Sequence, residues 1–434
     1  MTSFFIETYG CIHNFAESER MAGLLQEAKF EPAETLEQTD IIIFNVSPIS
    51  GPTEDAFFAR LDSIDKEYPY KSIIICGCIA QTEKKRLQKY SLIGSKQIHQ
   101  IVEVVEETIN NNTVQFLEIS EMPPLNLPKI RKNYLVEIIP ISLGCLSACV
   151  FCKSKQTKEM LESYPVEDII AVAQQAIKEG VKEIWLTSQD TFCYGFDIGT
   201  NLANLLKQLI QLPGNFIIRV GRGNPVNLLK IKNELLPLFN HPKVFKFIHV
   251  PMQAGSDKVL KDMKRGNTIA EFISLVATIK ETIPLVTLAT DIIIGFPTET
   301  EDDFWQTLEV VRKINPDVIN ISKFWSKSNT SAKKIEQILP EEVERRTKVL
   351  TDIFQNISTL QNERWIGWEG EILITEKGIQ DGQLVGRNPA YKPVVVDGQF
   401  SLGNIVPVKI TRTNTFDLRG EVIVKKPEVK IYRD

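Results

Sequence analysis

The stretch that decides the fold is Gly144-Cys145-Leu146-Ser147-Ala148-Cys149-Val150-Phe151-Cys152, in which three cysteines are separated by three and then by two residues. The apolar run from Val136 to Leu143 directly before it predicts a buried strand. Cysteine thiolates are the usual ligands of iron–sulfur clusters, which normally take four of them. A loop that supplies only three thiolates therefore leaves one iron of a four-iron cluster open to a small molecule.

A structural zinc site and a chance group of buried thiols are the two alternatives for this stretch. A structural zinc ion takes four ligands, so a fourth cysteine or histidine is expected close by. The nearest further cysteine, Cys193, is distant in sequence, although the fold can bring it near. The spacing of the three cysteines favours the iron–sulfur cluster.

The three cysteines resemble the CxxxCxxC signature of the radical S-adenosyl-L-methionine (SAM) enzymes. The resemblance implies that Cys145, Cys149 and Cys152 are catalytic residues that hold a four-iron, four-sulfur (4Fe-4S) cluster. It also implies that the open iron binds the methionine part of SAM. The reduced cluster would then cleave SAM to a carbon radical that abstracts a hydrogen atom.

Size and composition are those of an ordinary soluble chain of 434 residues, a length typical of about three domains. No apolar run is long enough to cross a bilayer and the N-terminus has no signal-peptide pattern, so we expect a cytoplasmic protein without a membrane partner. Seven cysteines in such a chain favour metal binding or catalysis over disulfides. The net charge of −5 neither suggests nor excludes a nucleic-acid partner, because binding depends on local patches.

Residues 1–122 indicate a small parallel α/β domain, because β-branched strands alternate with helices. The expected strands span residues 3–8, 40–46 and 73–76, and the expected helices span residues 16–28, 54–67 and 98–110. In open parallel sheets, ligands bind at the carboxyl ends of the strands. Cys11, Ser47 and Cys78 follow three such ends, so the fold can bring them together although they are far apart in sequence.

This region resembles the N-terminal domain of the methylthiotransferases, a branch of the radical SAM enzymes. That family places cysteines in a Tyr-Gly-Cys, an Asn-Thr-Cys and a Gly-Cys turn, and together they hold a second 4Fe-4S cluster. Cys11 and Cys78 match the first and third turns as metal ligands, whereas the second turn reads Asn45-Val46-Ser47. The nearby Gly51-Pro52-Thr53-Glu54 matches the archaeal and eukaryotic branch that acts on tRNA.

Ser47 is the departure that matters most, because a hydroxyl is a hard ligand and a poor substitute for a thiolate on iron. Three possibilities stay open: an engineered change from cysteine, replacement of the thiolate by Cys76, or a second cluster that is absent or labile. Cys76 and Cys78 are two residues apart and would face the same side of a strand. A buried strand thiol remains the favoured interpretation of Cys76.

Residues 133–365 repeat a strand-then-helix pattern after a proline-rich linker. The expected strands span residues 136–143, 183–187, 216–220, 245–250, 286–294 and 318–324, and a long polar helix spans residues 343–365. Six right-handed units of this kind form a partial (β/α)6 barrel, whose chemistry lies at the C-terminal ends of the strands. The cysteine stretch stands at such an end.

Polar residues also follow the other barrel strands. Taken singly, each is explained as well by a turn that begins a helix. Together they resemble four methylthiotransferase motifs that line the SAM pocket, LTSQD at residues 186–190, RVGxxNP at 219–225, HVPxQxGSD at 249–257 and TDIIxGFPxET at 290–300. The resemblance implies that Gln189, Arg219, Gln253 and Asp291 lie beside SAM or support its pocket.

Residues 366–434 change character to short β runs separated by glycine turns, which predicts a small β-barrel. This segment resembles a TRAM domain, an RNA-binding module. The resemblance implies RNA contacts through phosphate-binding cations and one stacking ring, namely Arg387, Tyr391, Lys392, Arg412 and Arg419. The alternative is a solvated barrel surface with ordinary charges.

The sequence as a whole resembles a tRNA methylthiotransferase that adds a methylthio group to C2 of N6-threonylcarbamoyladenosine beside the anticodon. The implied partners are tRNA, an electron donor such as a ferredoxin or flavodoxin, and a sulfur donor that the sequence does not identify. Because of Ser47, a single-cluster radical SAM enzyme of different chemistry is the alternative within catalysis. An RNA-binding protein with a structural cluster is the alternative without catalysis.

Overall fold

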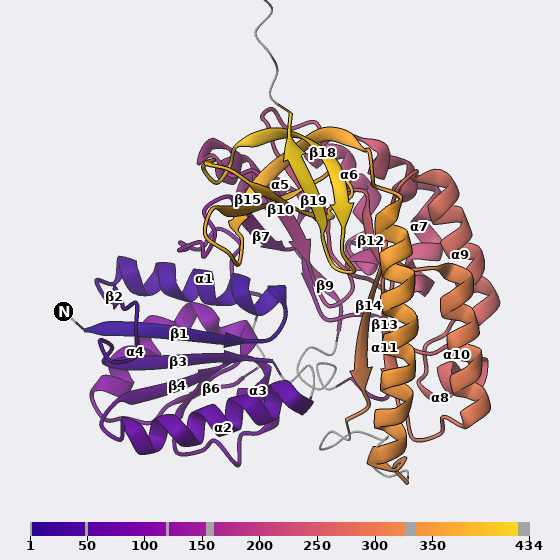
Figure 1. Ribbon diagram of the computed structural model, residues 1–434. Coiled ribbons are helices and arrows are strands. Elements are labelled where there is room, and N and C mark those ends of the chain that lie inside the picture. Colours follow the sequence, from indigo (N-terminus) through magenta and orange to yellow (C-terminus); the bar gives the residue numbers. More distant parts are fainter. Residues whose placement is uncertain (1, 48–50, 119–120, 153–159, 326–335, 424–434) are drawn as a thin grey trace, which may run out of the picture.

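The computed structural model describes residues 2–47, 51–118, 121–152, 160–325 and 336–423. Figure 1 shows an N-terminal α/β domain, a central array of strands covered by helices, and a small β-barrel built by the last strands. This order confirms the predicted fold class, and a closed five-stranded barrel stands where the C-terminal β segment was expected.

The N-terminal sheet has six parallel strands in the order β2-β1-β3-β4-β5-β6. The strands are β1 (Ser3–Tyr9), β2 (Glu31–Pro32), β3 (Ile41–Val46), β4 (Ser72–Cys76), β5 (Ser91–Ile93) and β6 (Gln115–Phe116). The helical segments α1 (Ile12–Glu27), η1 (Ser95–Gln100) and α4 (Ile101–Ile109) cover one face, and α2 (Gly51–Glu67) and α3 (Cys78–Thr82) cover the other. Because both faces of β3 and β4 are covered, these strands are apolar along almost their whole length.

The central barrel consists of two three-stranded parallel sheets, joined by an isolated bridge between Ile218 and Val244. Its strands are β7 (Val136–Pro140), β10 (Glu183–Thr187), β11 (Ile217–Val220), β12 (Phe247–His249), β13 (Thr287–Ile294) and β14 (Val318–Lys323). The helices between them are α5 (Val166–Lys178), α6 (Leu202–Leu209), α7 (Pro225–Leu235), α8 (Asp257–Asp262), α9 (Ile269–Thr282) and α10 (Glu301–Ile314), with short 3₁₀ turns η3 (Thr191–Cys193) and η4 (Leu236–Asn240). The strand order β7 to β14 is that of the predicted partial barrel.

Helix α1 of the N-terminal domain packs against the central barrel. Ala16 of α1 packs in one apolar cluster with Val136 and Ile138 of β7. The backbone N–H of Ile130 in the linker donates to the carbonyl of Glu19, at 2.9 Å. The two domains therefore share a packed interface rather than only a tether.

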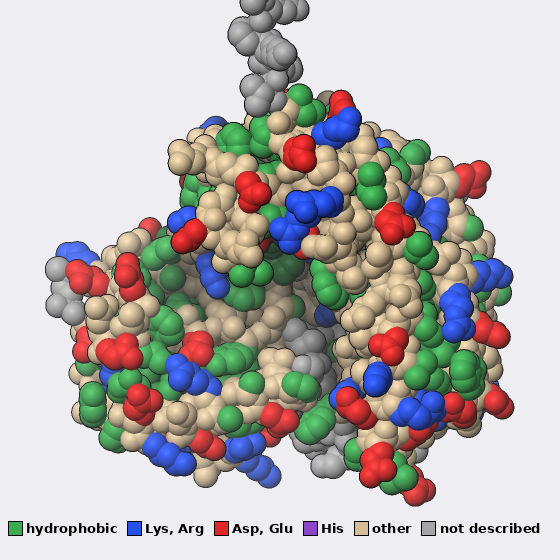
Figure 2. Space-filling model, viewed as in Figure 1, with side chains coloured by type: hydrophobic (Ala, Val, Ile, Leu, Met, Phe, Trp, Pro, Cys, Tyr) green, Lys and Arg blue, Asp and Glu red, His purple; other side chains and the backbone are tan. Residues whose placement is uncertain are grey.

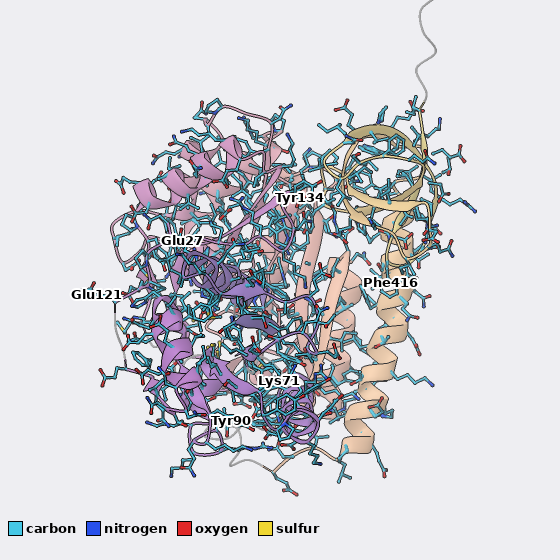
Figure 3. All side chains as sticks on the ribbon, turned by 90° about the vertical axis from the view of Figure 1, so that its left-hand side faces the viewer. Glu27, Lys71, Tyr90, Glu121, Tyr134 and Phe416 are labelled. Carbon is cyan, nitrogen blue, oxygen red and sulfur yellow. The ribbon has the colours of Figure 1, made fainter. Side chains whose placement is uncertain are left out.

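The C-terminal barrel is connected to the central one by the long helix α11 (Pro340–Glu363). Its strands are β15 (Glu369–Lys377), β16 (Gln383–Arg387), β17 (Pro393–Asp397), β18 (Ile405–Thr413) and β19 (Leu418–Val422), closed in the order β15-β16-β17-β19-β18. The loop between β18 and β19 rests on α11, since Ser358 Oγ donates to the carbonyl of Thr415 at 2.7 Å, and Phe416 lies beside this helix (Figure 3). Within the described residues, no helix combines the length and apolar character needed to cross a membrane.

Candidate iron–sulfur and SAM site

The cysteine loop leaves the end of the first barrel strand. The strand before the loop, β8 (Ser142–Leu143), pairs antiparallel with β9 (Glu162–Ser163). Gly144 follows β8 with a φ of 72°, and a Cβ there would lie 1.8 Å from the carbonyl oxygen of Met160, so only glycine fits this turn. The predicted position of the loop at the carboxyl end of a barrel strand is thus what the fold shows.

Neighbouring barrel elements hold the loop in place. Ser147 Oγ lies 2.6 Å from Nδ2 of Asn224, at the start of α7. The N–H of Val150 donates to the carbonyl of Met263 at 3.3 Å, and Val150 packs against the apolar cluster that α8 contributes to. Cys149 Sγ lies 3.3 Å from Nη1 of Arg265, which is buried. The loop is therefore docked on the barrel rim from two sides.

The donor set of the loop fits an iron–sulfur cluster. Cys145, Cys149 and Cys152 are thiols that are each partly exposed, so they are accessible to a ligand. Among the described residues, no three side chains of His, Cys, Asp or Glu lie close enough together to hold a single metal ion. A cluster of several irons needs its thiolates more widely spaced than one ion does, and a guanidinium beside Cys149 suits the negative charge of such a cluster.

Cys193 lies beside the cysteine loop, where its thiol interacts with Cys145 and with the backbone of Leu146. Its side chain is buried and its thiol donates to the carbonyl of Asp190 at 3.1 Å. Burial raises the pKa of the Cys193 thiol far above its ordinary value. The three loop cysteines differ from Cys193 in being partly exposed.

Asp291 is the centre of a polar group inside the barrel lumen. His249 Nε2 lies 2.7 Å from Asp291 Oδ1, and Asn320 Nδ2 donates to the same oxygen at 2.8 Å. Arg222 Nη1 lies 3.6 Å from Oδ2. Burial alone would raise the pKa of Asp291, but the hydrogen bond and charge of His249 and the charge of Arg222 lower it to about 2. Asp291 is therefore an anion at neutral pH.

Two other predicted SAM residues present polar atoms without a protein partner. Gln189 Oε1 and Arg219 Nε are buried and have no hydrogen-bond partner among the described residues. Buried polar atoms of this kind are rare, and a bound ligand is one way to satisfy them. Gln253 differs, because its backbone adopts a φ of 74° and its N–H donates to the carbonyl of Asp291 at 2.8 Å. The structure thus ties Gln253 to Asp291 through the backbone.

The three N-terminal strand ends do meet. Cys11 and Ser47 follow the adjacent strands β1 and β3, and Cys78 follows β4, which is next in the sheet. A Cβ on Gly10 would lie 3.2 Å from Cβ of Ser47, and one on Gly77 would lie 2.7 Å from the carbonyl oxygen of Val46. The two glycines therefore allow the turns of Cys11 and Cys78 to approach the turn of Ser47.

The thiols at these ends have weak neutral partners. Cys11 Sγ lies 3.6 Å from Oδ1 of Asn14, and Cys78 Sγ lies 3.6 Å from Oγ of Ser95. Cys76 is different, since it is fully buried in the apolar cluster under α1 and α4. The expectation that Cys76 and Cys78 share one face of a strand is wrong, because β4 ends at Cys76 and Cys78 begins α3.

The predicted RNA residues are three arginines of the C-terminal barrel and two further residues, Tyr391 and Lys392. Arg412 and Arg419 line a surface pocket of about 560 Å³ with Asn414. Arg387 lies beside Glu376, with its Nη2 2.9 Å from Oε1, and its guanidinium lies over the ring of Tyr391, 4.9 Å from the ring centre.

Tyr391 and Lys392 do not have the exposed positions that RNA contact requires. The Tyr391 ring is inserted into the central barrel, 4.8 Å from the ring of Phe245 and 4.9 Å from the guanidinium of Arg219. Lys392 is buried with its Nζ 2.9 Å from Asp317 Oδ1. Both side chains therefore connect the C-terminal barrel to the central barrel. The sequence did not reveal this role, because a hairpin loop with Tyr and Lys has the same composition whether it faces solvent or a neighbouring domain.

The sequence also did not identify His249, Asn224 and Arg265 as site residues. His249 and Asn224 lie within the HVPxQxGSD and RVGxxNP motifs. Their position in these motifs could have identified them as site residues. Arg265 lies outside these motifs, and its contact with Cys149 spans 116 positions of the chain. Only the folded barrel brings the two together.

Comparison with known families agrees with this geometry. The family model of the radical SAM superfamily matches residues 139–311, that of the uncharacterized protein family UPF0004 matches residues 3–94, and that of the TRAM domain matches residues 364–423. The radical SAM methyltransferase TsrM from Kitasatospora setae superposes with a TM-score of 0.53 at 11% identity, covering 74% of this chain and 73% of that one. The cobalamin-dependent radical SAM enzyme OxsB does so with a TM-score of 0.52 at 14% identity, covering 81% and 56%. The barrel and its cysteine loop therefore define a radical SAM protein.

Curated relatives narrow this class. The threonylcarbamoyladenosine tRNA methylthiotransferase of Xenopus laevis is 39% identical over 96% of this chain and 76% of its own length. The human protein of the same name is 37% identical over 98% of this chain and 74% of its own length, and a probable one from Methanothermobacter thermautotrophicus is 34% identical over 91% and 93%. The chain belongs to the threonylcarbamoyladenosine tRNA methylthiotransferase family.

Proposed function

We propose that this protein adds a methylthio group to C2 of N6-threonylcarbamoyladenosine beside the anticodon of tRNA, using SAM and an iron–sulfur cluster. The observation that carries the proposal is the cysteine loop on the rim of the barrel, in a chain that matches tRNA methylthiotransferases over almost its whole length. A bound 4Fe-4S cluster with one open iron supplies the electron that cleaves SAM to a hydrogen-abstracting radical.

The side chains of the barrel have separate tasks in this proposal. Cys145, Cys149 and Cys152 hold the cluster, and Asn224 and Arg265 hold the loop that carries them. Four residues line or support the SAM pocket in this proposal. Gln189 and Arg219 have polar atoms for which no described residue provides a hydrogen-bond partner. Gln253 and Asp291 are joined by a backbone hydrogen bond. The anionic Asp291 suits a hydroxyl or ammonium donor of the ligand.

Transfer of the methylthio group requires a sulfur species, which the family resemblance assigns to a second cluster at Cys11 and Cys78. The arrangement of the three strand ends, which lie side by side, supports the assembly of this site. Ser47 supplies an oxygen where the family has a thiolate, and Cys76 is not available to replace it. We infer that a second cluster at this site is held by two thiolates and is more labile than the first.

Ser47 also supports a second candidate function, a radical SAM enzyme with one cluster and different chemistry. Iron per chain after anaerobic reconstitution separates the two candidates when a Cys145→Ala variant is measured beside the wild type. About eight irons that fall to about four in the variant support methylthiolation. About four irons that fall to almost none support the single-cluster enzyme.

The direct test is a reaction of the reconstituted protein with tRNA, SAM, sulfide as the sulfur source and a chemical reductant, followed by mass analysis of the nucleosides. We expect threonylcarbamoyladenosine to gain a methylthio group in place of hydrogen, and the Cys145→Ala variant to give none. If a fully loaded protein forms no 5′-deoxyadenosine from SAM, both catalytic candidates are wrong and an RNA-binding protein with a structural cluster remains. A ferredoxin or flavodoxin is the class of electron donor that we propose for the cell.

A hollow of the surface supports the proposed binding of RNA. Figure 2 shows a hollow between the N-terminal domain and the C-terminal barrel, with Lys and Arg side chains on its upper rim. Arg387, Arg412 and Arg419 are the cations of the C-terminal barrel that we propose as tRNA phosphate contacts. RNA loops are recognised with their bases splayed out, so the modified adenosine has to leave the stack to enter the barrel.

A further inference from the structure

Arg265 contacts the cysteine loop, and this contact has no role in the proposed reaction beyond holding the loop. Its Nη1 lies 3.3 Å from Cys149 Sγ, which is within hydrogen-bond range for a sulfur acceptor. The side chain is 7% exposed, so water does not screen this contact strongly. Burial of a charge is costly unless it has a partner. The charges that act on Arg265 include the buried carboxylate of Asp190, and its contact with Cys149 is a second interaction.

The guanidinium is held rigidly at this point. Its Nη2 donates to the carbonyl of Pro251 at 3.1 Å, and the backbone N–H of Arg265 donates to the carbonyl of Leu260 at 2.9 Å. The preceding Lys264 has a φ of 56°, so the chain turns sharply where α8 ends and aims Arg265 back toward the barrel rim. These contacts fix Arg265 independently of the cysteine loop.

The loop is also fixed close to Cys149. The Ser147 hydroxyl is bound to Asn224 and the Val150 N–H to the carbonyl of Met263. Val150 and Phe151 pack against the cluster of Val259, Leu260 and Met263. Two neighbours of Cys149 are thus anchored, so its sulfur has little freedom to move away from Arg265.

We propose that Arg265 is a positioning residue that donates a hydrogen bond to the cluster ligand Cys149 and raises the reduction potential of that cluster. Reduction adds one negative charge to the cluster and its sulfur ligands. A charged donor on a ligand sulfur stabilises the reduced form more than the oxidised form, and hydrogen bonds to sulfur are among the factors that set the potentials of iron–sulfur clusters. The proposal rests on the proposed function, because it requires a cluster at the cysteine loop.

The test is a redox titration of the reconstituted full-length protein, followed by the electron paramagnetic resonance signal of the reduced cluster. Cys11 and Cys78 are replaced by alanine throughout, so that only the loop cluster gives a signal. In Arg265→Met we expect the ratio of reduced to oxidised cluster at a fixed ambient potential to fall about tenfold, which for a one-electron couple is a shift of about 59 mV to lower potential. Arg265→Lys keeps the positive charge but loses the planar guanidinium. We expect its midpoint potential to lie between those of the wild type and Arg265→Met.

Lys264→Gln is the matched control. It removes one positive charge at the residue directly before Arg265, and Lys264 is exposed. A midpoint potential of Arg265→Met equal to that of Lys264→Gln overturns the proposal. If Arg265→Met does not load iron, Arg265→Lys decides, and a wild-type potential in that variant overturns the proposal. Failure of the parent protein to load iron at the loop would instead contradict the proposed function.

Discussion

Asp291 connects three barrel strands through a single carboxylate. His249 comes from β12 and Asn320 from β14, and both contact the same oxygen of Asp291 on β13. The pKa of Asp291 is about 2 in the fold, against about 4 in an unfolded chain. Because the folded value is the lower one, the carboxylate stabilises the fold above about pH 4, and this contribution is lost as the pH falls toward 2.

Replacement of Asp291 by Asn should therefore remove a pH-dependent part of the stability. Two pKa units correspond to about 2.7 kcal/mol, of which about 2 kcal/mol is lost between pH 5 and pH 2.5. The free energy of unfolding of the wild type should therefore fall by about 2 kcal/mol more than that of the variant over this range. Urea unfolding at several pH values measures the difference. Parallel pH profiles for the two proteins would contradict the assignment of the low pKa to Asp291.

Ser47 decides how firmly iron is held at the N-terminal strand ends. A hydroxyl oxygen is a harder and weaker ligand for cluster iron than a thiolate. The turn of Ser47 lies against the turn of Cys11, because a Cβ on Gly10 would come within 3.2 Å of the Ser47 side chain. A cysteine at residue 47 would therefore place its side chain against the turn that carries Cys11.

We expect Ser47→Cys to slow the loss of iron from this site to a chelator by about tenfold or more, because a thiolate replaces a hydroxyl. The measurement uses a protein without the three loop cysteines, so that only the N-terminal site contributes iron. Cys76→Ala in the same background is the control and should release iron at the parent rate, since Cys76 lies in the apolar core. Faster loss of iron from Cys76→Ala than from the parent would mean that Cys76 is a ligand.

The hairpin between β16 and β17 joins the two barrels as a structural element. Its Tyr391 ring packs with Phe245 and Phe247 and lies under Arg219 of β11. Tyr391 has a φ of 62°, an uncommon backbone conformation that the surrounding contacts have to support. The hairpin therefore determines the position of the C-terminal barrel and also forms one wall around a predicted SAM residue.

Tyr391→Ala should loosen this connection. Loss of a buried aromatic ring costs about 3 kcal/mol, and the cation–π contact with Arg219 is lost as well. We expect a lower melting temperature and faster proteolytic cleavage near residues 364–368, where α11 ends and the C-terminal barrel begins. Tyr391→Phe retains the ring and should resemble the wild type, and equal cleavage of all three proteins would show that the hairpin does not hold the barrels together.

Long elements of the fold could be predicted from the sequence, whereas several of the shortest strands could not. Strand β3 is an almost continuous apolar run, and β13 ends in three isoleucines, so each pattern predicts a strand by itself. The strands β2, β5 and β6 have only two or three residues and exist because a neighbouring strand pairs with them. The same distinction applies to the site, where local spacing revealed the cysteine loop but not its partner Arg265, whose contact is made only in the folded barrel.

The whole molecule carries a net charge of −5, yet its proposed substrate is a polyanion. Binding then depends on a local group of cations, and the C-terminal barrel offers Arg412 and Arg419 in one pocket of about 560 Å³. Arg419 is partly neutralised, since its Nε lies 2.7 Å from Oδ1 of Asp417. Phosphate contacts release counterions from RNA, so their number is reported by the salt dependence of binding.

Replacement of Arg412 or Arg419 by Gln should weaken tRNA binding and reduce the slope of log K against log salt by about 1 for each phosphate contact removed. Fluorescence anisotropy with labelled tRNA over a series of salt concentrations measures both quantities. Lys409→Gln is the control on β18, because Lys409 is exposed, paired with Glu369 at 2.8 Å and absent from the pocket lining. A slope that changes as much in Lys409→Gln as in the arginine variants would mean that RNA responds to the total charge of the barrel and not to this pocket. A change confined to the arginine variants would place tRNA phosphates at the pocket of Arg412 and Arg419 on the C-terminal barrel.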